Sequence, residues 1–308
     1  MTAWIAPEPT TPAADLDRVD PRICVPLLAV HAACLAAPLT GVSAPALAAC
    51  AALFVLRAFG LTAGYHRLLA HHAFRTSRAG RFALAWLGAS AAQLGPLWWV
   101  GHHRLHHRHA DTERDVHPPG LRGLWWAHMG WLLCRRHART PLEQVPDLAR
   151  FPELRWLDRW HAVPPLVCAA LLYATGSLLE RRAPQLGADG AQLVAWGFFV
   201  STTLLYHVTF AVNSLGHSVG RQRFPGRDQS RNHALLALLT LGDGWHNNHH
   251  RHPRWARHGL APAEPDATYA VLRGLAALGV VWDLRGPATS ATRQAPRQAS
   301  AKRSPTRA

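Results

Sequence analysis

Residues 45–63 read PALAACAALFVLRAFGLTA, and the motif HRLLAH follows almost at once, at residues 66–71. The run is apolar apart from Arg57, and a helix needs about 20 apolar residues to cross the hydrocarbon core of a bilayer. Stretches of similar character occupy residues 23–40, 164–179 and 192–212. The sequence therefore predicts four transmembrane helices. Buried core helices of a soluble protein are the alternative, because several of these stretches are short and contain Pro or Gly.

The connections between the apolar stretches pair them into two hairpins. Residues 41–44 join the first pair, and a short segment containing Arg181 and Arg182 joins the second. Both hairpins return to one side, which then carries residues 1–22, 64–163 and 213–308. Most arginines fall on that side, so the positive-inside rule assigns it to the cytoplasm, although Arg181 and Arg182 run against the rule.

These patterns predict an all-α integral membrane protein, with four transmembrane helices in two hairpins. A cytosolic helical cap, formed by residues 64–163 and 213–283, completes a domain that spans residues 22–283. Residues 1–21 and the basic tail at 284–308 are expected to be disordered, because aperiodic polar sequence buries too little apolar surface to fold. We expect the chain in the inner (cytoplasmic) membrane of a bacterium, with its active site on the cytoplasmic side.

The formal net charge of +15 is compatible with nucleic acid, an anionic membrane surface or an acidic protein as partner. Nucleic acid is the least favoured, since the arginines are not interleaved with an aromatic platform and no recognition motif is present. The five cysteines lack CxxC spacing and mostly lie in apolar runs, which favours small core residues over disulfides or metal ligands.

The most informative residues are the 21 histidines, many of which fall in short motifs at the ends of the apolar stretches. HRLHH at residues 103–107 and HNNHH at 246–250 each place three histidines at spacings that share one face of a helix. His66 and His71 are five apart, or roughly 140° around a regular helix, so we expect them to serve one metal each. Asn213 and His217 are four apart and face together.

Imidazole suits iron, copper and zinc, so the ligand type alone does not identify the metal. A zinc hydrolase of the HExxH type is not indicated, because no such motif is present. Nine imidazoles exceed the needs of one ion, which indicates a pair of metals. A non-catalytic metal buffer or transporter is a further alternative, but its histidines should lie within the spans, whereas these lie at the ends.

These motifs, in this order, resemble those of the membrane-bound fatty-acid desaturases, in particular the Δ9 stearoyl-type branch. The resemblance covers roughly residues 22–283. Its elements are HRLLAH at 66–71, HRLHH at 103–107, NSLGH at 213–217 and GDGWHNNHH at 242–250. Supporting matches are Asp111-Thr112, Asp115, His117 and the segment FPELRWLD at 151–158.

The resemblance implies a centre of two iron ions, with an asparagine held to one of them through a water. Carried over to this sequence, the ligands are His66, His71, His103, His106, His107, His217, His246, His249 and His250, with Asn213 as the water-linked residue. It also implies a four-helix membrane bundle under a cytosolic cap, with a kinked acyl tunnel below the metals.

The expected reaction is O2-dependent insertion of a cis double bond, at Δ9, into a saturated acyl chain. The expected partners are membrane lipids, O2, an acyl substrate (acyl-CoA, acyl-carrier protein or acyl lipid) and a separate electron donor such as a ferredoxin-type protein, since no haem domain is appended. A membrane di-iron hydroxylase or ketolase is the alternative.

The sequence departs from the family pattern at three points, one of which is His72, where arginine is common. Gly101-His102 stands before the second motif where acyl-CoA enzymes often have Arg-Asp, which puts CoA in doubt as the acyl carrier. Asp243 stands where the family usually has glutamate. Neutral histidine ligands are often tuned by nearby acids, and Asp111, Asp115 and Asp243 are the candidates, with plain surface acids as the alternative.

Overall fold

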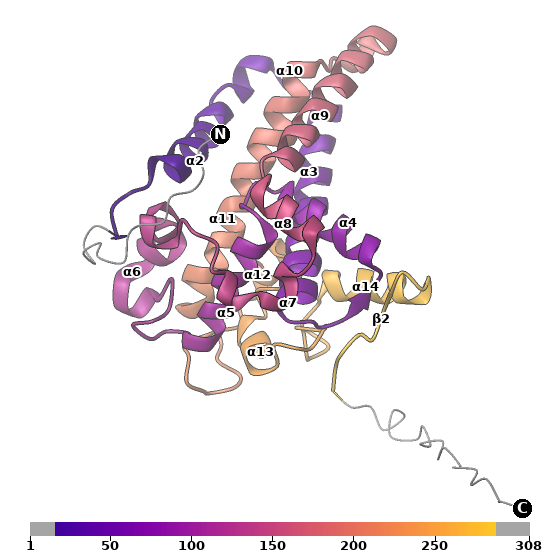
Figure 1. Cartoon of the computed structure of the whole chain (residues 1–308). Helices are drawn as coiled ribbons and strands as arrows, with labels where there is room; N and C mark the ends of the chain where they lie inside the picture. The colour runs from indigo at the N-terminus through magenta and orange to yellow at the C-terminus, as the bar shows by residue number, and fades with distance from the viewer. Residues whose placement is uncertain (1–15, 288–308) are drawn as a thin grey trace, which may run out of the picture.

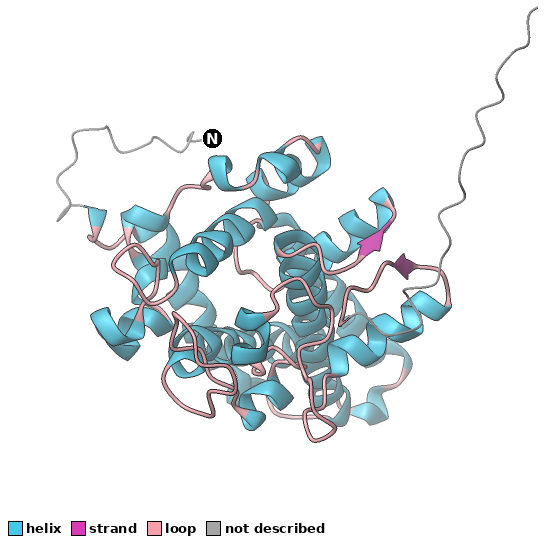
Figure 2. Cartoon of the chain, turned by 90° about the horizontal axis from the view of Figure 1, so that it is seen from below, coloured by secondary structure: helices cyan, strands magenta, loops and turns pink. Residues whose placement is uncertain are grey.

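The computed structural model describes residues 16–287, and this part of the chain is mostly helical. The expected disorder of residues 1–21 and 284–308 therefore falls largely outside the described residues. Two very short strands, β1 (Arg75–Thr76) and β2 (Val281–Trp282), pair antiparallel at the edge of the molecule (Figure 2). This pairing holds the end of the described chain next to β1, which closely follows the first histidine motif.

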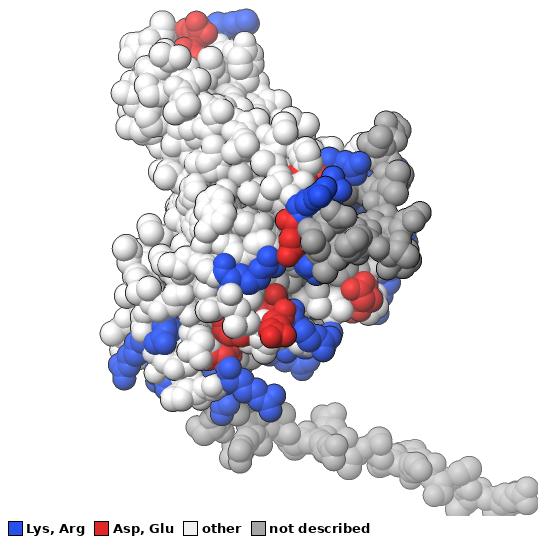
Figure 3. Space-filling model, turned by 90° about the vertical axis from the view of Figure 1, so that its left-hand side faces the viewer, with Lys and Arg blue, Asp and Glu red and all other residues white. Residues whose placement is uncertain are grey.

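Three helices are long and apolar enough to cross a membrane: Ala44–Ala70, Val163–Arg182 and Gly190–His217. With 27, 20 and 28 residues, they reach about 30 Å or more at about 1.5 Å per residue, the thickness of a hydrocarbon core. Their shared length forms a belt that is almost free of charge, while charged side chains gather below it and in a small group at the tip (Figure 3). The prediction of a helical, membrane-associated protein is confirmed at this level.

The fourth expected span, over residues 23–40, is not confirmed. Helix α2 covers only Pro21–Cys34, and a 3₁₀ turn, η1, follows at Ala37–Thr40. Pro38 accounts for the break, because it lacks the backbone N–H that would donate to the carbonyl of Cys34, four residues earlier, and its ring clashes with that carbonyl in a helix. In Figure 1, α2 stands beside the bundle, and it packs mainly on the middle of the third long helix.

The first and third long helices are not regular along their length. The first is α3 (Ala44–Phe59) continued by a π-helix, η2 (Gly60–Ala70). The third consists of α10 (Gly190–Leu193), the π-helix η7 (Val194–Val200), α11 (Ser201–Ser214) and the 3₁₀ turn η8 (Leu215–His217). The second is a single α-helix, α9 (Val163–Arg182). π-Helical turns are rare and frequently mark functional sites.

Polar and small residues bring these helices close together. Arg57 on α3 is fully buried and donates to the hydroxyls of Ser201 and Thr202 on α11. Gly60 and Gly64 on η2 contact the backbone of α4 (Arg78–Ala89) so closely that a Cβ would lie 2.6 Å from it. Only glycine permits this approach, which sets η2 firmly against the cap.

The cap lies at one end of the bundle, opposite the tip formed by α9 and α10 (Figure 1). Its larger helices are α4, α5 (Pro96–His109), α6 (Pro119–His128), α8 (Pro152–Arg159) and α14 (Ala267–Ala277). Short helices complete it: α7 (Pro146–Ala149), α12 (Ala234–Leu239) and α13 (His246–Arg251), with the 3₁₀ turns η3 (Gly130–Leu133), η4 (Arg135–His137) and η5 (Leu142–Gln144). One further 3₁₀ turn, η6 (Pro184–Leu186), joins α9 to α10 at the opposite end.

Candidate metal centre

The π-helix η2 brings the two histidines of the first motif together. The backbone N–H of His71 donates to the carbonyl of His66, five residues earlier, at 3.2 Å. Residues five apart therefore stack on one face, and the two ring centroids are 5.0 Å apart. The expectation that His66 and His71 serve one metal each, based on regular helical geometry, is wrong on this geometry, because both side chains join the same cluster.

The second motif lies on the last turns of α5, whose start is fixed by a half-buried carboxylate. Oδ1 of Asp158 on α8 accepts from the backbone N–H groups of Leu97 and Trp98, both at 2.9 Å. It satisfies two of the four N–H groups that a helix leaves unpaired at its first turn. Asp158 belongs to the FPELRWLD segment, so that segment positions the second histidine motif.

The final motif forms the short helix α13, which amide side chains hold in place. Oδ1 of Asn232 accepts from the backbone N–H of Asn248 at 3.1 Å, and the Asn248 amide donates to the carbonyl of His258 at 2.9 Å. The Trp245 indole N–H donates to the carbonyl of Pro265 at 2.7 Å. A six-residue helix has little stability of its own, and these bonds supply its position.

Nine histidines gather in two compact groups, each with its ring nitrogens within 4.8 Å of one another. The five-histidine group consists of His66, His71, His103, His107 and His249. The four-histidine group consists of His106, His217, His246 and His250. Each HxxHH triplet is divided between the groups, so the three histidines that share a helix face in each motif do not form one cluster. One group takes the i and i+4 histidines of the second motif, and the other takes those of the final motif.

The nitrogens that face each other within the groups are all Nε2 atoms. In the five-histidine group, Nε2 of His249 lies 2.9 Å from that of His66 and from that of His107. Nε2 of His71 lies 2.7 Å from that of His103. In the four-histidine group, the separations are 3.3 Å for His106 and His250 and 3.0 Å for His217 and His246.

The protonation of these rings makes the groups fit metal ions. Nδ1 of His66 lies 2.8 Å from an oxygen of Asp243, and since a carboxylate only accepts, Nδ1 must carry the proton. A neutral ring then has a bare lone pair on Nε2, aimed into the group. At imidazole–metal bonds of about 2.1 Å, two ligands at right angles lie about 3 Å apart, which matches these separations.

All three acids proposed from the sequence contact a histidine of these groups at Nδ1. Asp243 accepts from His66 at 2.8 Å, Asp115 from His106 at 2.9 Å and Asp111 from His217 at 2.8 Å. Burial opposes ionisation of each carboxyl, but the attraction and hydrogen bonds of the histidines outweigh it and hold the pKa of Asp111, Asp115 and Asp243 below its usual range. They are therefore ionised acceptors, which orient the rings and strengthen their donor nitrogens.

Burial and crowding keep most histidines of the two groups neutral. Burial lowers the pKa of His71, His103, His107, His246, His249 and His250 well below its usual value, and neighbouring imidazoles add to the effect. Neutral imidazole is the form that binds a metal ion.

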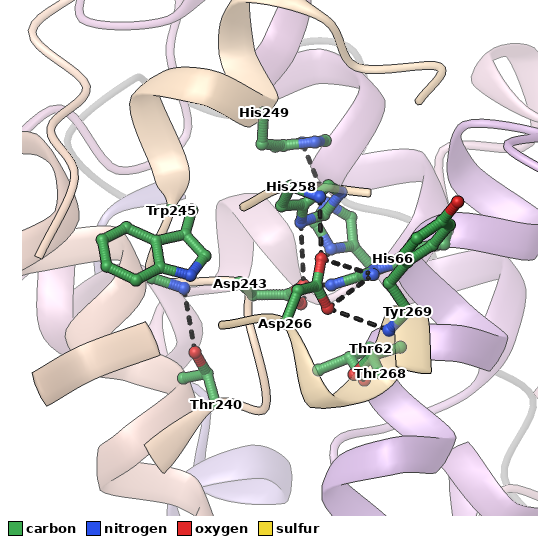
Figure 4. Close-up of polar contacts among 12 residues, drawn as sticks. Thr62, His66, Thr240, Asp243, Trp245, His249, His258, Asp266, Thr268 and Tyr269 are labelled. Carbon is green, nitrogen blue, oxygen red and sulfur yellow. Dashed lines mark hydrogen bonds and ion pairs between the residues drawn. The ribbon is translucent and has the colours of Figure 1, made fainter. Parts of the chain in front are cut away.

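Sequence reasoning missed several residues around the groups. The carboxylate of Asp228 lies 3.4 Å from Nδ1 of His250, and Nδ1 of His258 lies 3.1 Å from Asp243. Arg67, fully buried, bridges Asp243 and Asp266 at 3.0–3.1 Å (Figure 4 shows both carboxylates beside His66 and His258). None of these lies at a motif spacing, although Arg67 is the residue within HRLLAH next to His66. His117, a supporting match, lies with His106 and Asp115.

Asn213, the expected water-linked residue, lies on α11 one turn before His217. It lines an apolar cavity of about 540 Å³. His103 of the five-histidine group lines the same cavity, as do Trp98, Trp99, Leu94, Thr209 and Phe210. The cavity thus passes from the five-histidine group into the membrane-spanning part of the molecule.

A mostly helical frame with three apolar long helices and two histidine groups beside an apolar cavity defines a membrane-associated protein with a candidate two-metal centre. The family model "Fatty acid desaturase" matches residues 43–276. The chain belongs to the fatty acid desaturase family, and the prediction of an oxidoreductase that desaturates fatty-acyl chains is confirmed.

Relatives at moderate identity come from cyanobacteria and plants. An sn-2 palmitoyl-lipid 9-desaturase of Nostoc sp. (strain 36) is 38% identical over 226 residues, 72% of this chain and 74% of the relative. An sn-1 stearoyl-lipid 9-desaturase of Anabaena variabilis is 36% identical over 228 residues, 73% and 78% of the two chains. The acyl-CoA 5-desaturase AL21 of Anemone leveillei is 34% identical over 261 residues, 84% and 77%.

Proposed function

We propose that this chain is a Δ9 acyl-lipid desaturase whose two histidine groups each hold one iron ion. The observation that carries the proposal is the convergence of nine Nε2 atoms, in two groups, at the end of an apolar cavity. The names of the Nostoc and Anabaena relatives support position 9 and a lipid-bound substrate. In the proposed assignment, Asn213 reaches the four-histidine ion through a water.

The reaction balances only with an external electron donor. Two C–H bonds of neighbouring methylenes break and one C=C bond forms, so the acyl chain gives up two electrons and two protons. O2 accepts four electrons and four protons and leaves as two waters. The donor therefore supplies two electrons, and solvent supplies two protons. The bound irons would supply the oxidising chemistry, which acid–base side chains cannot provide.

The residues of the chain bind and orient the acyl substrate and exclude water. The cavity is lined mostly by apolar and aromatic side chains, as a dry acyl site requires. His103 and Asn213 mark its reactive end, while Phe198, Phe199 and Ala169 line it within the long helices. The distance along the cavity to the histidines would select the methylene pair that is attacked, since position is set by where the chain is held.

The route into this cavity favours a lipid over a soluble carrier. Its walls include Ile23, Pro26 and Leu27 on α2, and Pro165 and Leu166 on α9. Leu166 is 67% exposed, and α2 packs mainly on η3, η7 and α11 rather than along α9. The cavity therefore opens sideways between α2 and α9, on apolar surface that would face the membrane. A chain attached to a membrane lipid enters there without leaving the bilayer.

Placement in the cytoplasmic membrane, with the histidine groups on the cytoplasmic side, is part of the proposal. It is supported by the arginines that surround the cap, following the positive-inside rule. α2 and η1 together would complete the fourth crossing of the four-helix arrangement, with α2 tilted against η7.

Expression in a host whose own desaturase is deleted tests the proposal. The intact chain should restore monounsaturated membrane lipids, with the double bond at carbon 9 by mass spectrometry and two irons per chain by elemental analysis. His106→Ala is the control and should restore none. Oxygenated rather than unsaturated acyl chains would identify a hydroxylase or ketolase instead, and unsaturation confined to acyl-CoA would overturn the lipid substrate.

A further inference from the structure

A second hollow, of about 540 Å³, opens on the cap and has a different character from the apolar cavity. Its lining contains five arginines and a single acid. The charged residues are Arg75, Arg81, Arg150, Arg254, Arg285 and Asp147. Phe74, Phe151 and Trp282 supply apolar surface between the charges.

Little of this positive charge is neutralised within the described residues. Asp147 is paired with Arg104, at 2.6 and 3.0 Å, and with His72, at 3.0 Å, rather than with an arginine of the hollow. Arg75 has Asp283 at 3.3 Å, on the exposed surface. No carboxylate of residues 16–287 pairs with Arg150, Arg254 or Arg285, all of them exposed. Arg81 and Arg150 instead crowd the ring of Phe151, at 4.0 and 4.9 Å.

The hollow adjoins the five-histidine group. Leu68, Leu69 and His72, which line it, flank His71 in the sequence. Arg104, the partner of Asp147, follows His103 and donates to the carbonyls of Leu69 and Ala70 at 2.9 and 3.2 Å. Residues that line the hollow, and Arg104 that is bonded to its lining, are thus sequence neighbours of His71 and His103.

The hollow is not placed to receive the headgroup of the acyl substrate. It shares no lining residue with the apolar cavity. The cavity is walled by α2, α9, α11 and the inward face of α5, whereas the hollow is walled by η2, α4, α7 and the strand β2. The five clustered arginines match an anionic partner other than the substrate.

We propose that this arginine-lined hollow is the docking site of an acidic electron-transfer protein of the ferredoxin type. The inference rests on the proposed function, which requires two electrons from outside the chain. Electron transfer weakens with distance, so the donor must approach a buried centre closely, and the hollow offers that approach beside the five-histidine group. Carboxylates around the donor's redox centre would match the arginines, with Trp282 and Phe151 supplying apolar contact.

Charge reversal within the hollow tests the proposal in full-length enzyme reconstituted in lipid nanodiscs. The test variant combines Arg150→Glu and Arg254→Glu, two exposed side chains without recorded ion pairs. A plant-type [2Fe–2S] ferredoxin is the probe, and its association rate and KM are measured against ionic strength. We expect association about 10–10³-fold slower at low salt, since steering has this size, and a difference that shrinks as salt screens the charges.

The matched control combines Arg227→Glu and Arg273→Glu. Both are exposed cap residues outside the hollow, and the change in net charge is the same. The control should keep most of the wild-type association rate. If ferredoxin association slows equally in both variants, the effect is one of net charge and the docking site is overturned. Unchanged association in the test variant would also overturn it. The neutral pair Arg150→Gln and Arg254→Gln should fall between wild type and charge reversal.

Single-turnover measurements separate this proposal from the proposed function. Enzyme reduced chemically without oxygen, then mixed with O2, should form the same amount of unsaturated lipid in wild type, test variant and control, because ferredoxin is absent. No product in the wild type would sink the proposed function. Normal product in every variant, together with unimpaired ferredoxin binding in the test variant, would sink the docking site alone.

Discussion

The two histidine groups differ in what lies behind their imidazoles. Three of the four rings in the four-histidine group have a carboxylate near Nδ1: Asp115 behind His106, Asp111 behind His217 and Asp228 behind His250. In the five-histidine group, Asp243 behind His66 is the carboxylate recorded among the described residues. There, His103 instead has Trp99 stacked on it, with centroids 4.9 Å apart.

Between the two groups, the number of imidazoles and the basicity of their donor nitrogens compensate for each other. A carboxylate behind an imidazole raises the basicity of the opposite nitrogen and fixes the ring. The group with fewer imidazoles has more of them supported in this way. The group with more imidazoles depends on packing and on one carboxylate, Asp243, which the buried Arg67 also holds.

Removing one ring from each group should have the largest effect and shows whether the groups act as one centre. We expect His106→Ala and His103→Ala each to lose desaturation by well over a hundredfold, because loss of a ligand exceeds the roughly 10–100-fold cost of losing its supporting residue. Each variant should still bind about one iron per chain, measured by elemental analysis. Full activity in either variant would show that its group is not catalytic.

Arg67→Met should produce the next largest effect, on stability. It leaves Asp243 and Asp266 without their buried cation, and breaking a buried pair costs about 3–5 kcal/mol. The free energy of unfolding of the metal-free protein, from denaturant titration in detergent, measures the loss. Arg78→Met is the control, because it pairs with Glu153 at the surface and exposed ion pairs contribute little to stability.

Asp115→Asn should weaken the four-histidine group selectively. The amide keeps the size of the carboxylate but loses its charge, so we expect metal affinity to fall by about 10–100-fold at this group alone. Competition with a chelator, followed by the iron Mössbauer signal, measures the two sites separately. Equal loss at both sites would mean that Asp115 supports the fold of the whole centre.

Trp99→Leu should have the smallest effect. It changes the five-histidine group, because Trp99 stacks on His103. The stacked ring contributes about 0.5–1.5 kcal/mol beyond its area, so metal affinity at the five-histidine group should fall by about two- to tenfold. The same chelator competition detects it. If metal affinity falls as much in Trp99→Leu as in Asp115→Asn, the two groups do not differ in whether packing or a carboxylate supports their imidazoles.

The sequence predicted the set of histidines that gather, because the motif positions at the ends of apolar stretches were visible without a structure. It did not predict their division. A pattern at i, i+3 and i+4 shows that three rings share a face, but not that the face borders two sites. Nor does it reveal a π-helix, in which residues five apart come together. That these histidines bind iron stays a prediction.

The three acids next to the histidines were candidates from the sequence, whereas Asp228 was not. Asp111 and Asp115 closely follow the second motif and Asp243 precedes the last, but Asp228 lies in a loop with no fixed spacing to His250. The first apolar stretch, residues 23–40, predicts a single span because its composition is uniform. Helix α2 ends earlier because of the proline at position 38, and a hydropathy average does not show this effect.

The wide turns of η2 place a constraint on chain length as well as on residue identity. Removing one residue between Gly60 and Ala70 would let the segment relax to a regular α-helix, and every position before the deletion would rotate by about 100° relative to His71. An insertion or a deletion in this segment would therefore turn His66 away from the other histidines of its group, even if every remaining side chain were kept.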